Sequence, residues 1–356
     1  MAIKVLVVDD SALIRALLKE IIASDPDLIL VGQAPDAYVA RDMIKQFNPD
    51  VITLDIEMPR MDGLTFLEKL MHARPTPVVM ISSLTEQGAE ATFRAMELGA
   101  VDFVAKPKLG IREGMADYAE EIRQKLKDAS RARIIRRPTD NAPRAPSAAT
   151  RATSRMPFAG TEKILAIGAS TGGTEAIKDV LLDMPADSPG IVITQHMPAG
   201  FTRTFAERLN RLTRLNVMEA RGGERIMPGQ AYIAPGGQHL LVVRSGANYE
   251  TRLSDAEPVW RHRPAVDPMF ESLAECAGQN VVAALLTGMG KDGARGLLAI
   301  RESGGYTFAQ DEATSVIYGM PKEAVNLNAA EEVLPLQEIA LNMLEQCRKR
   351  GAGNRV

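Results

Sequence analysis

The order in which short apolar runs and helical patterns follow one another constrains the fold of this chain most strongly. In the first third, five runs of strand length end in polar or turn residues, and helical apolar periodicity separates them. The runs read KVLVVDD, DLILVGQA, PDVITLDIEMP, PTPVVMISS and AVDFVAKP. Continuous Val, Ile and Leu runs suit strands that helices cover on both faces. We therefore expect a doubly wound parallel α/β sheet with its site at the carboxyl ends of the strands.

A second alternating pattern begins with EKILAIGASTGGTEAIKDVLLDM and predicts another doubly wound α/β unit with a mainly parallel sheet. The two patterns are separated by residues 130–160, which hold seven arginines, four prolines and one acidic residue. This composition predicts an extended tether, and contact with anionic lipid or an acidic partner is the alternative. We predict one domain over residues 1–128, a linker over 129–160 and a second domain over 161–350.

Acidic residues stand at the ends of two predicted strands in the first domain. Asp9 and Asp10 close the first strand, and Asp55 closes the third. Three such carboxylates repel one another, and a hard cation such as Mg²⁺ relieves the repulsion with oxygen ligands while leaving positions for phosphate. Lys106 and Ser82 end the fifth and fourth strands with an ammonium and a hydroxyl. Together these residues predict a phosphoryl acceptor. Taken singly, a paired Asp is more often a helix cap and a lysine a solvated side chain.

The segments VVDDSALIR, TLDIEMPRMDG, MISS and FVAKP resemble the receiver domain of two-component response regulators over roughly residues 1–125. The resemblance implies a flavodoxin-like (βα)5 fold and phosphorylation of Asp55 by a histidine kinase. It also implies that Asp9 and Asp10 help to bind Mg²⁺, and that Ser82 and Phe103 change position on phosphorylation. Many receivers carry threonine at the position of Ser82.

In the second domain, a glycine-rich turn follows the first predicted strand. Gly168 to Gly172 matches the G-x-S-x-G pattern of a hydrolase nucleophile elbow, with Ser170 at its centre. Small neighbours permit a sharp strand-to-helix turn that exposes the hydroxyl near a helix N-terminus. A phosphate-binding turn is the competing interpretation. The segment fits neither G-x-G-x-x-G nor the P-loop, so the hydrolase interpretation is favoured.

A serine hydroxyl needs an adjacent base to become a nucleophile. His196 follows another apolar strand in IVITQHMPAGF, so it can meet Ser170 across neighbouring strand ends. His72 lies in the first domain, and His239 resembles an ordinary structural histidine. His262 is the rival base, but its two flanking arginines disfavour a protonated imidazolium. We therefore expect His196 to be the base.

A carboxylate should orient the histidine and stabilise its cationic form. VVAALLTGMGKDGARGLLAI predicts a buried strand, a glycine-rich turn and a helix, with Asp292 in the turn. Alone, Asp292 would be a helix N-cap. With Ser170 and His196 at corresponding strand ends, a triad is the better interpretation. Ser170, Asp255 and His262 form a second possible triad, although Asp255 and His262 fall in an irregular stretch.

Segments in both domains together resemble the chemotaxis protein-glutamate methylesterases of the CheB type. They are IGASTGGTEAI, QHMPAGFTRTFAERLN, YIAPGG, RHRPAVD and LTGMGKDGARGL, following a receiver. The resemblance implies hydrolysis of glutamate methyl esters on methyl-accepting chemotaxis receptors, often with deamidation of glutamines. By motif match it puts the triad on Ser170, His196 and Asp292. The arginine-rich linker is not part of the shared pattern.

The expected chemistry follows from these parts. Ser170 attacks the ester carbonyl while His196 takes its proton, and water then hydrolyses the acyl-enzyme. Backbone N–H groups after Ser170, at Thr171, and in the Gly288–Gly290 turn, at Met289, are candidate donors to the oxyanion. No metal or organic cofactor is expected for hydrolysis.

Composition excludes several other classes of protein. A net charge of −3 argues against nucleic acid as the main partner. No apolar run reaches the roughly 18 residues that span a bilayer, and the N-terminus lacks the pattern of a signal peptide. Cys276 and Cys347 form no motif and are expected to be reduced. We expect a cytoplasmic protein without a transition-metal site.

Two other functions are compatible with these patterns. The second domain could be a binding module without hydrolytic activity, or a general serine esterase or peptidase, because a triad fixes acyl transfer and not the acyl group. The length of the linker suggests a form of control in which the receiver covers the hydrolytic site until Asp55 is phosphorylated.

Overall fold

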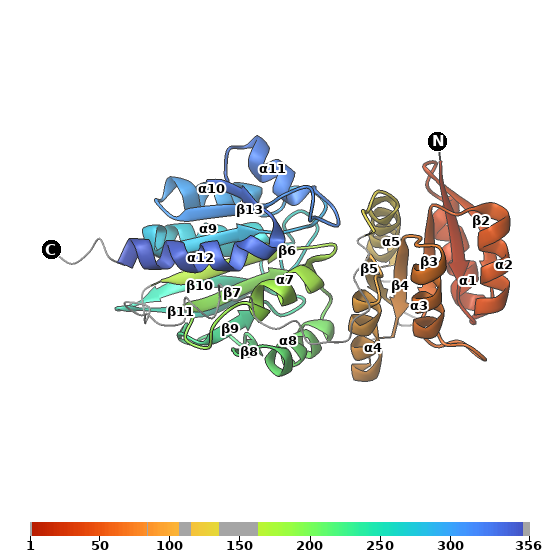
Figure 1. The fold of residues 1–356 in the computed structure, drawn as a ribbon, viewed down its shortest axis with the longest axis horizontal. Coiled ribbons are helices and arrows are strands. Elements are labelled where there is room, and N and C mark those ends of the chain that lie inside the picture. Colours follow the sequence, from red (N-terminus) through yellow and green to blue (C-terminus); the bar gives the residue numbers. More distant parts are fainter. Residues whose placement is uncertain (1, 84, 107–114, 135–162, 352–356) are drawn as a thin grey trace. The chain divides into compact units, whose positions relative to one another are not determined.

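The computed structural model describes residues 2–83, 85–106, 115–134 and 163–351. The chain divides into two compact units, residues 1–140 and 141–356 (Figure 1). Residues 135–160 of the predicted linker lie outside the described residues. In the described part of the chain, no helix is both long and apolar enough to cross a membrane.

The N-terminal unit is built on five parallel strands in the order β2-β1-β3-β4-β5. The strands are β1 (Ile3–Val8), β2 (Leu28–Ala34), β3 (Val51–Asp55), β4 (Val78–Ser82) and β5 (Asp102–Ala105). The helices are α1 (Ala12–Ala23), α2 (Ala37–Phe47), α3 (Gly63–Ala73), α4 (Glu86–Glu97) and α5 (Met115–Ser130). Helices α1 and α5 pack together, as do α3 and α4. Every residue of β3 and β4 is buried, so the predicted doubly wound sheet is confirmed.

Polar residues at the carboxyl ends of these strands begin the helices that follow. In each case the side-chain oxygen accepts a backbone N–H of the first helical turn, which satisfies a donor that the helix itself cannot pair. The capping residues of α1 to α4 are Ser11, Asp36, Asp62 and Thr85. Ser11 is therefore the N-cap residue of α1. Asp9 and Asp10 do not have the helix-capping role that a paired Asp after a strand often has.

The C-terminal unit has a seven-stranded sheet in which all neighbouring pairs are parallel. In sheet order, the strands are β14 (Glu332–Leu334), β13 (Tyr306–Gln310), β12 (Val281–Leu285), β6 (Ile164–Ala169), β7 (Gly190–Gln195), β9 (Gln230–Ile233) and β8 (Asn216–Glu219). A separate two-stranded antiparallel sheet is formed by the hairpin of β10 (His239–Ser245) and β11 (Asn248–Ser254). The predicted mainly parallel sheet is confirmed.

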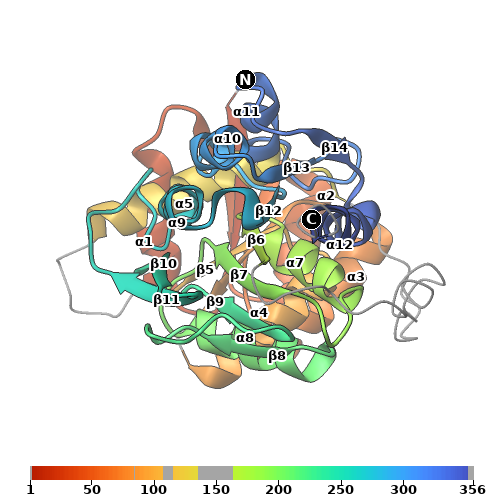
Figure 2. The same cartoon turned by 90° about the vertical axis from the view of Figure 1, so that its left-hand side faces the viewer.

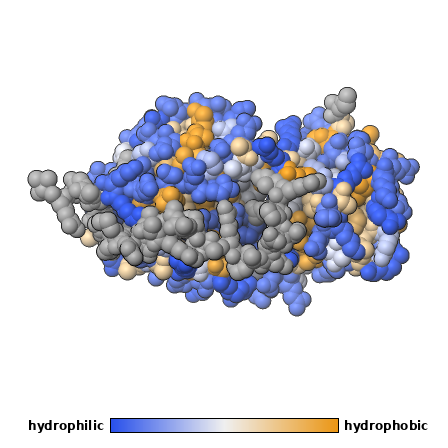
Figure 3. Space-filling view, viewed as in Figure 1, coloured by the Kyte–Doolittle hydropathy of each residue, from blue (hydrophilic) through white to orange (hydrophobic). Residues whose placement is uncertain are grey.

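Helices cover both faces of this sheet (Figure 2). They are α7 (Gly173–Leu182), α8 (Phe201–Leu212), α9 (Val266–Cys276), α10 (Ala294–Glu302), α11 (Met320–Asn326) and α12 (Leu336–Gly351). Helices α7 and α12 pack together on one side, and α9, α10 and α11 form the other layer. A buried apolar cluster that includes Phe270, Leu285 and Leu297 joins α9 and α10 to the strands. On the face drawn in Figure 3, the coloured residues are mostly hydrophilic.

The chain order reverses beside β6. From β6 the chain proceeds to β7, β8 and β9 on one side, and it then returns to build β12, β13 and β14 on the other. Such a reversal separates the loops that leave the carboxyl ends of neighbouring strands, and opens a crevice there. The residues that follow β6, β7 and β12 consequently meet at one edge of the sheet.

Candidate functional site

Ser170 lies in the sharp turn between β6 and α7. Its N–H donates to the carbonyl oxygen of Thr287 at 3.0 Å, which ties the turn to the segment after β12. Gly172 adopts a left-handed conformation with φ of 77° immediately before α7. A Cβ at Gly172 would lie 2.7 Å from side-chain atoms of Val316, so both the backbone and the space favour glycine. The predicted strand-to-helix turn around Ser170 is therefore present.

His196 follows β7 and contacts Ser170, which follows the adjacent strand β6. Its backbone N–H donates to the carbonyl oxygen of Ala169 at 3.3 Å, which extends the β6–β7 pairing by one residue. Its ring atom Nδ1 lies 3.0 Å from Ser170 Oγ. This is hydrogen-bonding distance between a hydroxyl nucleophile and a base.

Asp292 completes the chain of side chains on the far side of His196. Its Oδ2 lies 2.7 Å from His196 Nε2. The same carboxylate accepts the backbone N–H groups of Val266 at 2.6 Å and Asp267 at 2.9 Å. These are the first two residues of α9, so Asp292 does bind a helix N-terminus, but not that of α10, whose N-cap residue is Gly293.

The pKa of Asp292 lies below its usual value. Burial acts to raise it, but the hydrogen bond and charge of His196 and the two α9 N–H groups outweigh burial. The side chains of His196 and Asp292 are only 6% and 2% exposed. An ionised Asp292 accepts a hydrogen bond from the N–H at Nε2 of His196, which leaves Nδ1 as the ring atom that can take the hydroxyl proton of Ser170. The arrangement can move a proton from serine to histidine.

The other histidines occupy different positions. His262 stacks on His196, with ring centroids 3.8 Å apart and planes 13° apart. His239 is buried, with Nδ1 accepting the N–H of Ala265 at 3.2 Å and Nε2 lying 3.1 Å from the carbonyl oxygen of Glu257. His239 therefore holds loops together, as the sequence suggested. Asp255 is exposed and accepts a hydrogen bond from Gln238, so the arrangement does not favour the second possible triad.

The turn that follows β12 lies against Ser170. A Cβ on Gly288 would be 2.7 Å from Ser170 Cβ, so glycine permits this approach. The N–H of Gly288 donates to the carbonyl oxygen of Ile317, which removes it as an oxyanion donor. Within the described residues, the Met289 N–H makes no hydrogen bond, and it remains a candidate together with that of Thr171.

Two polar residues that sequence reasoning missed hold this site in shape. Gln195 Nε2 donates to the carbonyl oxygen of Ser170 at 2.9 Å. Thr287 Oγ1 donates to the carbonyl oxygen of Thr171 at 3.0 Å and accepts the N–H of Ile317 at 3.0 Å. Each of these two polar side chains is buried at or just beyond the end of an otherwise apolar strand. That position in the sequence is the feature from which a role in the site could have been predicted.

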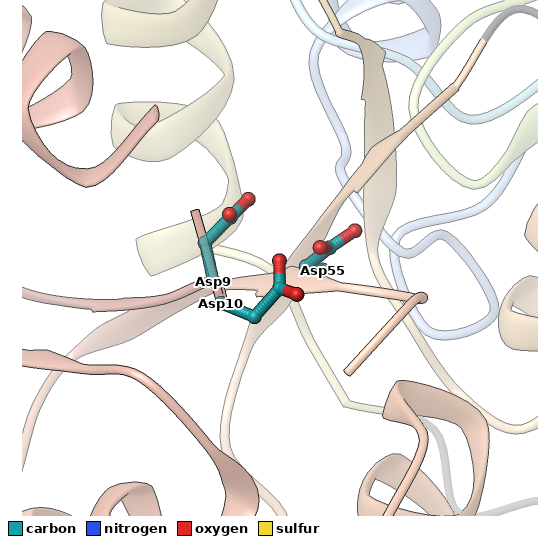
Figure 4. Close-up of side chains that lie close together, drawn as sticks. All are labelled: Asp9, Asp10 and Asp55. Carbon is teal, nitrogen blue, oxygen red and sulfur yellow. The ribbon is translucent and has the colours of Figure 1, made fainter. Parts of the chain in front are cut away.

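The N-terminal unit brings Asp9, Asp10 and Asp55 together (Figure 4). One ligand oxygen from each lies within 4.8 Å of the others. Lys106 Nζ lies 2.7 Å from Asp55 Oδ2 and 3.5 Å from Asp9 Oδ2. Burial, together with the charge of Asp9, raises the pKa of Asp55 to about 6 despite the hydrogen bond from Lys106. Burial also raises the pKa of Asp9.

Ser82 ends β4 and Phe103 lies in β5, as the apolar runs in the sequence predicted. Ser82 Oγ donates to the carbonyl oxygen of Gly88 in α4 at 3.1 Å. The ring of Phe103 is buried and packs edge to face on Phe93 of α4, with centroids 6.2 Å apart. Both side chains therefore contact α4, and their roles as switch residues remain a prediction.

Comparison with known proteins agrees with this division of the chain. Residues 5–113 match the model of the response regulator receiver domain, and residues 165–343 match that of the CheB methylesterase. A protein-glutamate methylesterase/protein-glutamine glutaminase 2 from Pseudomonas aeruginosa is 70% identical over 356 residues, covering 100% of both chains. A protein-glutamate methylesterase/protein-glutamine glutaminase from Thiobacillus denitrificans is 60% identical over 97% of both chains.

Among solved structures, the catalytic domain of the Thermotoga maritima CheB methylesterase is similar to this chain, with 37% identity and a TM-score of 0.51. The match covers 52% of this chain and 99% of that one. The predicted family is thus confirmed by two domain models in the expected order and by relatives matched over nearly their whole length. This chain belongs to the CheB methylesterase family, with a response regulator receiver domain ahead of its catalytic domain.

Proposed function

We propose that this chain is a phosphorylation-regulated hydrolase that cleaves glutamate methyl esters, and deamidates glutamines, on methyl-accepting chemotaxis receptors. The observation that carries the proposal is the continuous hydrogen-bonded series from Ser170 Oγ through His196 to Asp292. The names of the relatives indicate the substrate group, which is a glutamate methyl ester or a glutamine amide. A non-hydrolytic binding module would not need this series, and a general esterase is not favoured by the relatives.

In the proposed reaction, Ser170 Oγ attacks the ester carbonyl carbon as His196 Nδ1 takes the hydroxyl proton. The developing imidazolium is stabilised by ionised Asp292, whose low pKa keeps it charged. His196 returns the proton to the departing methoxide, which leaves as methanol. Water then gives a proton to His196 and attacks the acyl-enzyme, and His196 returns that proton to Ser170 Oγ as the glutamate carboxylate is released. The N–H groups of Thr171 and Met289 are the proposed donors to the oxyanion.

The proposed control begins at Asp55, which accepts a phosphoryl group from a chemotaxis histidine kinase. Asp9, Asp10 and Asp55 would hold Mg²⁺, and the fit is supported by three carboxylates within 4.8 Å of one another, two of them buried. When bound, the cation neutralises carboxylate charge and leaves positions for phosphate oxygens. Lys106 provides a second positive charge at Asp55. Ser82 and Phe103 are proposed to carry the change to α4, which both already contact.

The division into residues 1–128, 129–160 and 161–350 and a location in the cytoplasm are part of the same proposal. Helix α5 continues to Ser130, two residues beyond the proposed first boundary. Both cysteines of the chain are free thiols, as is usual in a reducing compartment.

The test measures methanol released from membranes that carry methylated receptors. The wild type should release methanol, faster with a small-molecule phosphodonor, and Ser170→Ala should release none above background under either condition. If no wild-type sample released methanol, the methylesterase proposal would be wrong.

A second comparison tests inhibition by the receiver. Residues 160–356 alone should be at least as active as the phosphorylated whole chain, and Asp55→Ala should abolish the response to phosphodonor. If the shortened chain were as slow as the unphosphorylated whole chain, release from inhibition would not explain the control.

A further inference from the structure

The turn that joins β11 to α9 has an unusual backbone beside the triad. Trp260 and Arg261 both have positive φ, 53° and 68°. Val259 and His262 exchange two backbone hydrogen bonds of 3.1 and 2.9 Å around them. This two-residue hairpin favours Asn or Gly, so a tryptophan and an arginine there are strained. Strained backbone with bulky side chains is concentrated at functional sites.

Hydrogen bonds and ring packing connect this turn to the triad at both ends. After the turn, the ring of His262 stacks on that of His196. Within the turn, Trp260 Nε1 donates to Asp267 Oδ2 at 2.8 Å, and the N–H of Asp267 donates to Asp292 Oδ1. The indole is consequently held at the rim of the catalytic site while Trp260 remains 37% exposed.

Two cations lie over the exposed ring. Lys291 Nζ is 4.2 Å from the centroid of Trp260, and Arg295 Cζ is 5.9 Å from it. Lys291 immediately precedes Asp292 in the chain, and its contact with the indole places its ammonium beside Trp260. An aromatic face attracts a cation and restricts its position without neutralising it.

The ammonium of Lys291 is held by the ring of Trp260. Within the described residues, no carboxylate lies in ion-pair distance of its ammonium. Arg295 approaches Glu271 at 3.4 Å, but these side chains are 64% and 44% exposed, and such pairs are weak. The rim therefore presents a cation that is positioned but available to an anionic ligand.

We propose that Trp260, Lys291 and Arg295, named here the Trp260 rim, form a subsite that binds an acidic side chain of the substrate near the esterified glutamate. The inference rests on the proposed function. An esterified glutamate is uncharged and offers nothing to a cation, whereas an unesterified carboxylate nearby in the same protein segment does. The Trp260 rim thus selects ester groups that have acidic neighbours, and Lys291 is a specificity residue.

The test compares two synthetic peptides that each carry one glutamate γ-methyl ester. One has glutamates on both sides of the ester, and the other has glutamines at the same positions. In the methanol-release assay, kcat/KM of the wild type should be about tenfold higher for the acidic peptide than for the glutamine peptide, mainly because KM is lower. The preference should shrink as salt is added, because the Trp260 rim is exposed.

Variants of Lys291 test whether the Trp260 rim causes the preference for the acidic peptide. Lys291→Gln should reduce the ratio between the peptides to near one, and Lys291→Arg should restore most of it. Lys349→Gln is the matched control, since Lys349 is an exposed lysine on α12 and its loss should leave the ratio unchanged. If Lys291→Gln slowed both peptides equally, or kept the preference, the inference would be wrong.

Two further outcomes would overturn the Trp260 rim as a substrate subsite, each for a different reason. If the wild type released methanol from neither peptide nor receptor membranes, the proposed function would fail and the subsite with it. If Lys291→Gln weakened binding to vesicles of anionic lipid while the peptide ratio stayed the same, the Trp260 rim would be a lipid contact and would not select substrates.

Discussion

Asp55 and Asp292 are both buried carboxylates near the ends of parallel strands, yet their surroundings are opposite. Asp292 is surrounded by donors, since His196 and two N–H groups of α9 share its two oxygens, and its pKa is lowered. Asp55 has Lys106 on Oδ2 and the N–H of Glu57 at 3.3 Å on Oδ1, but it shares its site with two further carboxylates, and burial raises its pKa to about 6.

The difference shows how one type of residue serves two purposes. A carboxylate whose oxygens are all engaged is a fixed negative charge, suited to orienting a histidine. A carboxylate with neighbouring negative charge and few donors retains reactivity and affinity for a cation or a phosphoryl group. Burial alone does not distinguish them, because both are nearly inaccessible to solvent. The hydrogen-bond donors around each carboxylate make the difference.

The largest test of the comparison is Asp292→Asn. Loss of the charge and of the selected tautomer of His196 should lower kcat for methanol release by roughly 10⁴-fold. Phosphorylation of Asp55, measured by uptake of labelled phosphoryl group from a small-molecule donor, should not change. A variant that retained most of its activity would contradict the role of Asp292 as a fixed charge.

Asp55→Asn should have the opposite consequence, a gain in stability. Because the pKa of Asp55 is raised from 3.8 to about 6, the folded receiver binds a proton more tightly than the unfolded chain. Its free energy of unfolding therefore falls as pH rises from about 4 to about 6 and stays low above that range. Without divalent cations at pH 8, Asp55→Asn should gain about 2–3 kcal/mol, and the gain should disappear near pH 4.

A two-probe unfolding experiment measures this gain. Trp260 is the only tryptophan and lies in the C-terminal unit, so its fluorescence follows that unit. The receiver transition is the part of the circular-dichroism change that fluorescence does not follow. A difference between wild type and Asp55→Asn that was independent of pH would show that the charge of Asp55 is not the cause.

Magnesium should stabilise the receiver by a similar amount. At a concentration 100 times its dissociation constant, Mg²⁺ should add about 2.7 kcal/mol to the free energy of unfolding at pH 8. Asp10→Asn should lose most of this gain, while Asp292→Asn should keep it. An equal gain in the transition followed by Trp260 would indicate a general salt effect in place of a site.

The smallest expected effect belongs to Ser82→Ala. Loss of the hydrogen bond from Ser82 to Gly88 should change stability by no more than about 1 kcal/mol. Methanol release without phosphodonor should be unchanged, and stimulation by phosphodonor should fall a few-fold. Full stimulation in this variant would remove Ser82 from the proposed switch.

Much of the architecture was predictable because apolar runs and strand ends are local signals. The strands of the N-terminal unit and the turn at Ser170 were each predicted from one short segment. The local signal for helix α5 is weaker, because its buried face is marked only by sparse residues such as Ile122 and Leu126. The fold class and the family are confirmed, whereas the roles of the site residues remain predictions.

Contacts between distant segments were harder to predict. Nothing local to Asp292 indicates that it binds the first N–H groups of α9, which begins 26 residues earlier. The stacking of His262 on His196 likewise depends on the hairpin at Trp260 and Arg261, whose residue types argue against such a turn. His262 is a rival base on sequence alone, because spacing along the chain does not show that its ring stacks on that of His196.

The binding of Asp292 to α9 also links activity to native packing. The carboxylate that orients His196 is the same one that holds the first turn of a helix packed on the sheet and on α10. The site is therefore assembled only when this part of the core has closed, and no partly folded form that has released α9 keeps an oriented histidine. On heating, loss of hydrolytic rate and loss of tertiary structure in this unit should follow a single curve, so that enzymatic turnover reports the intact fold.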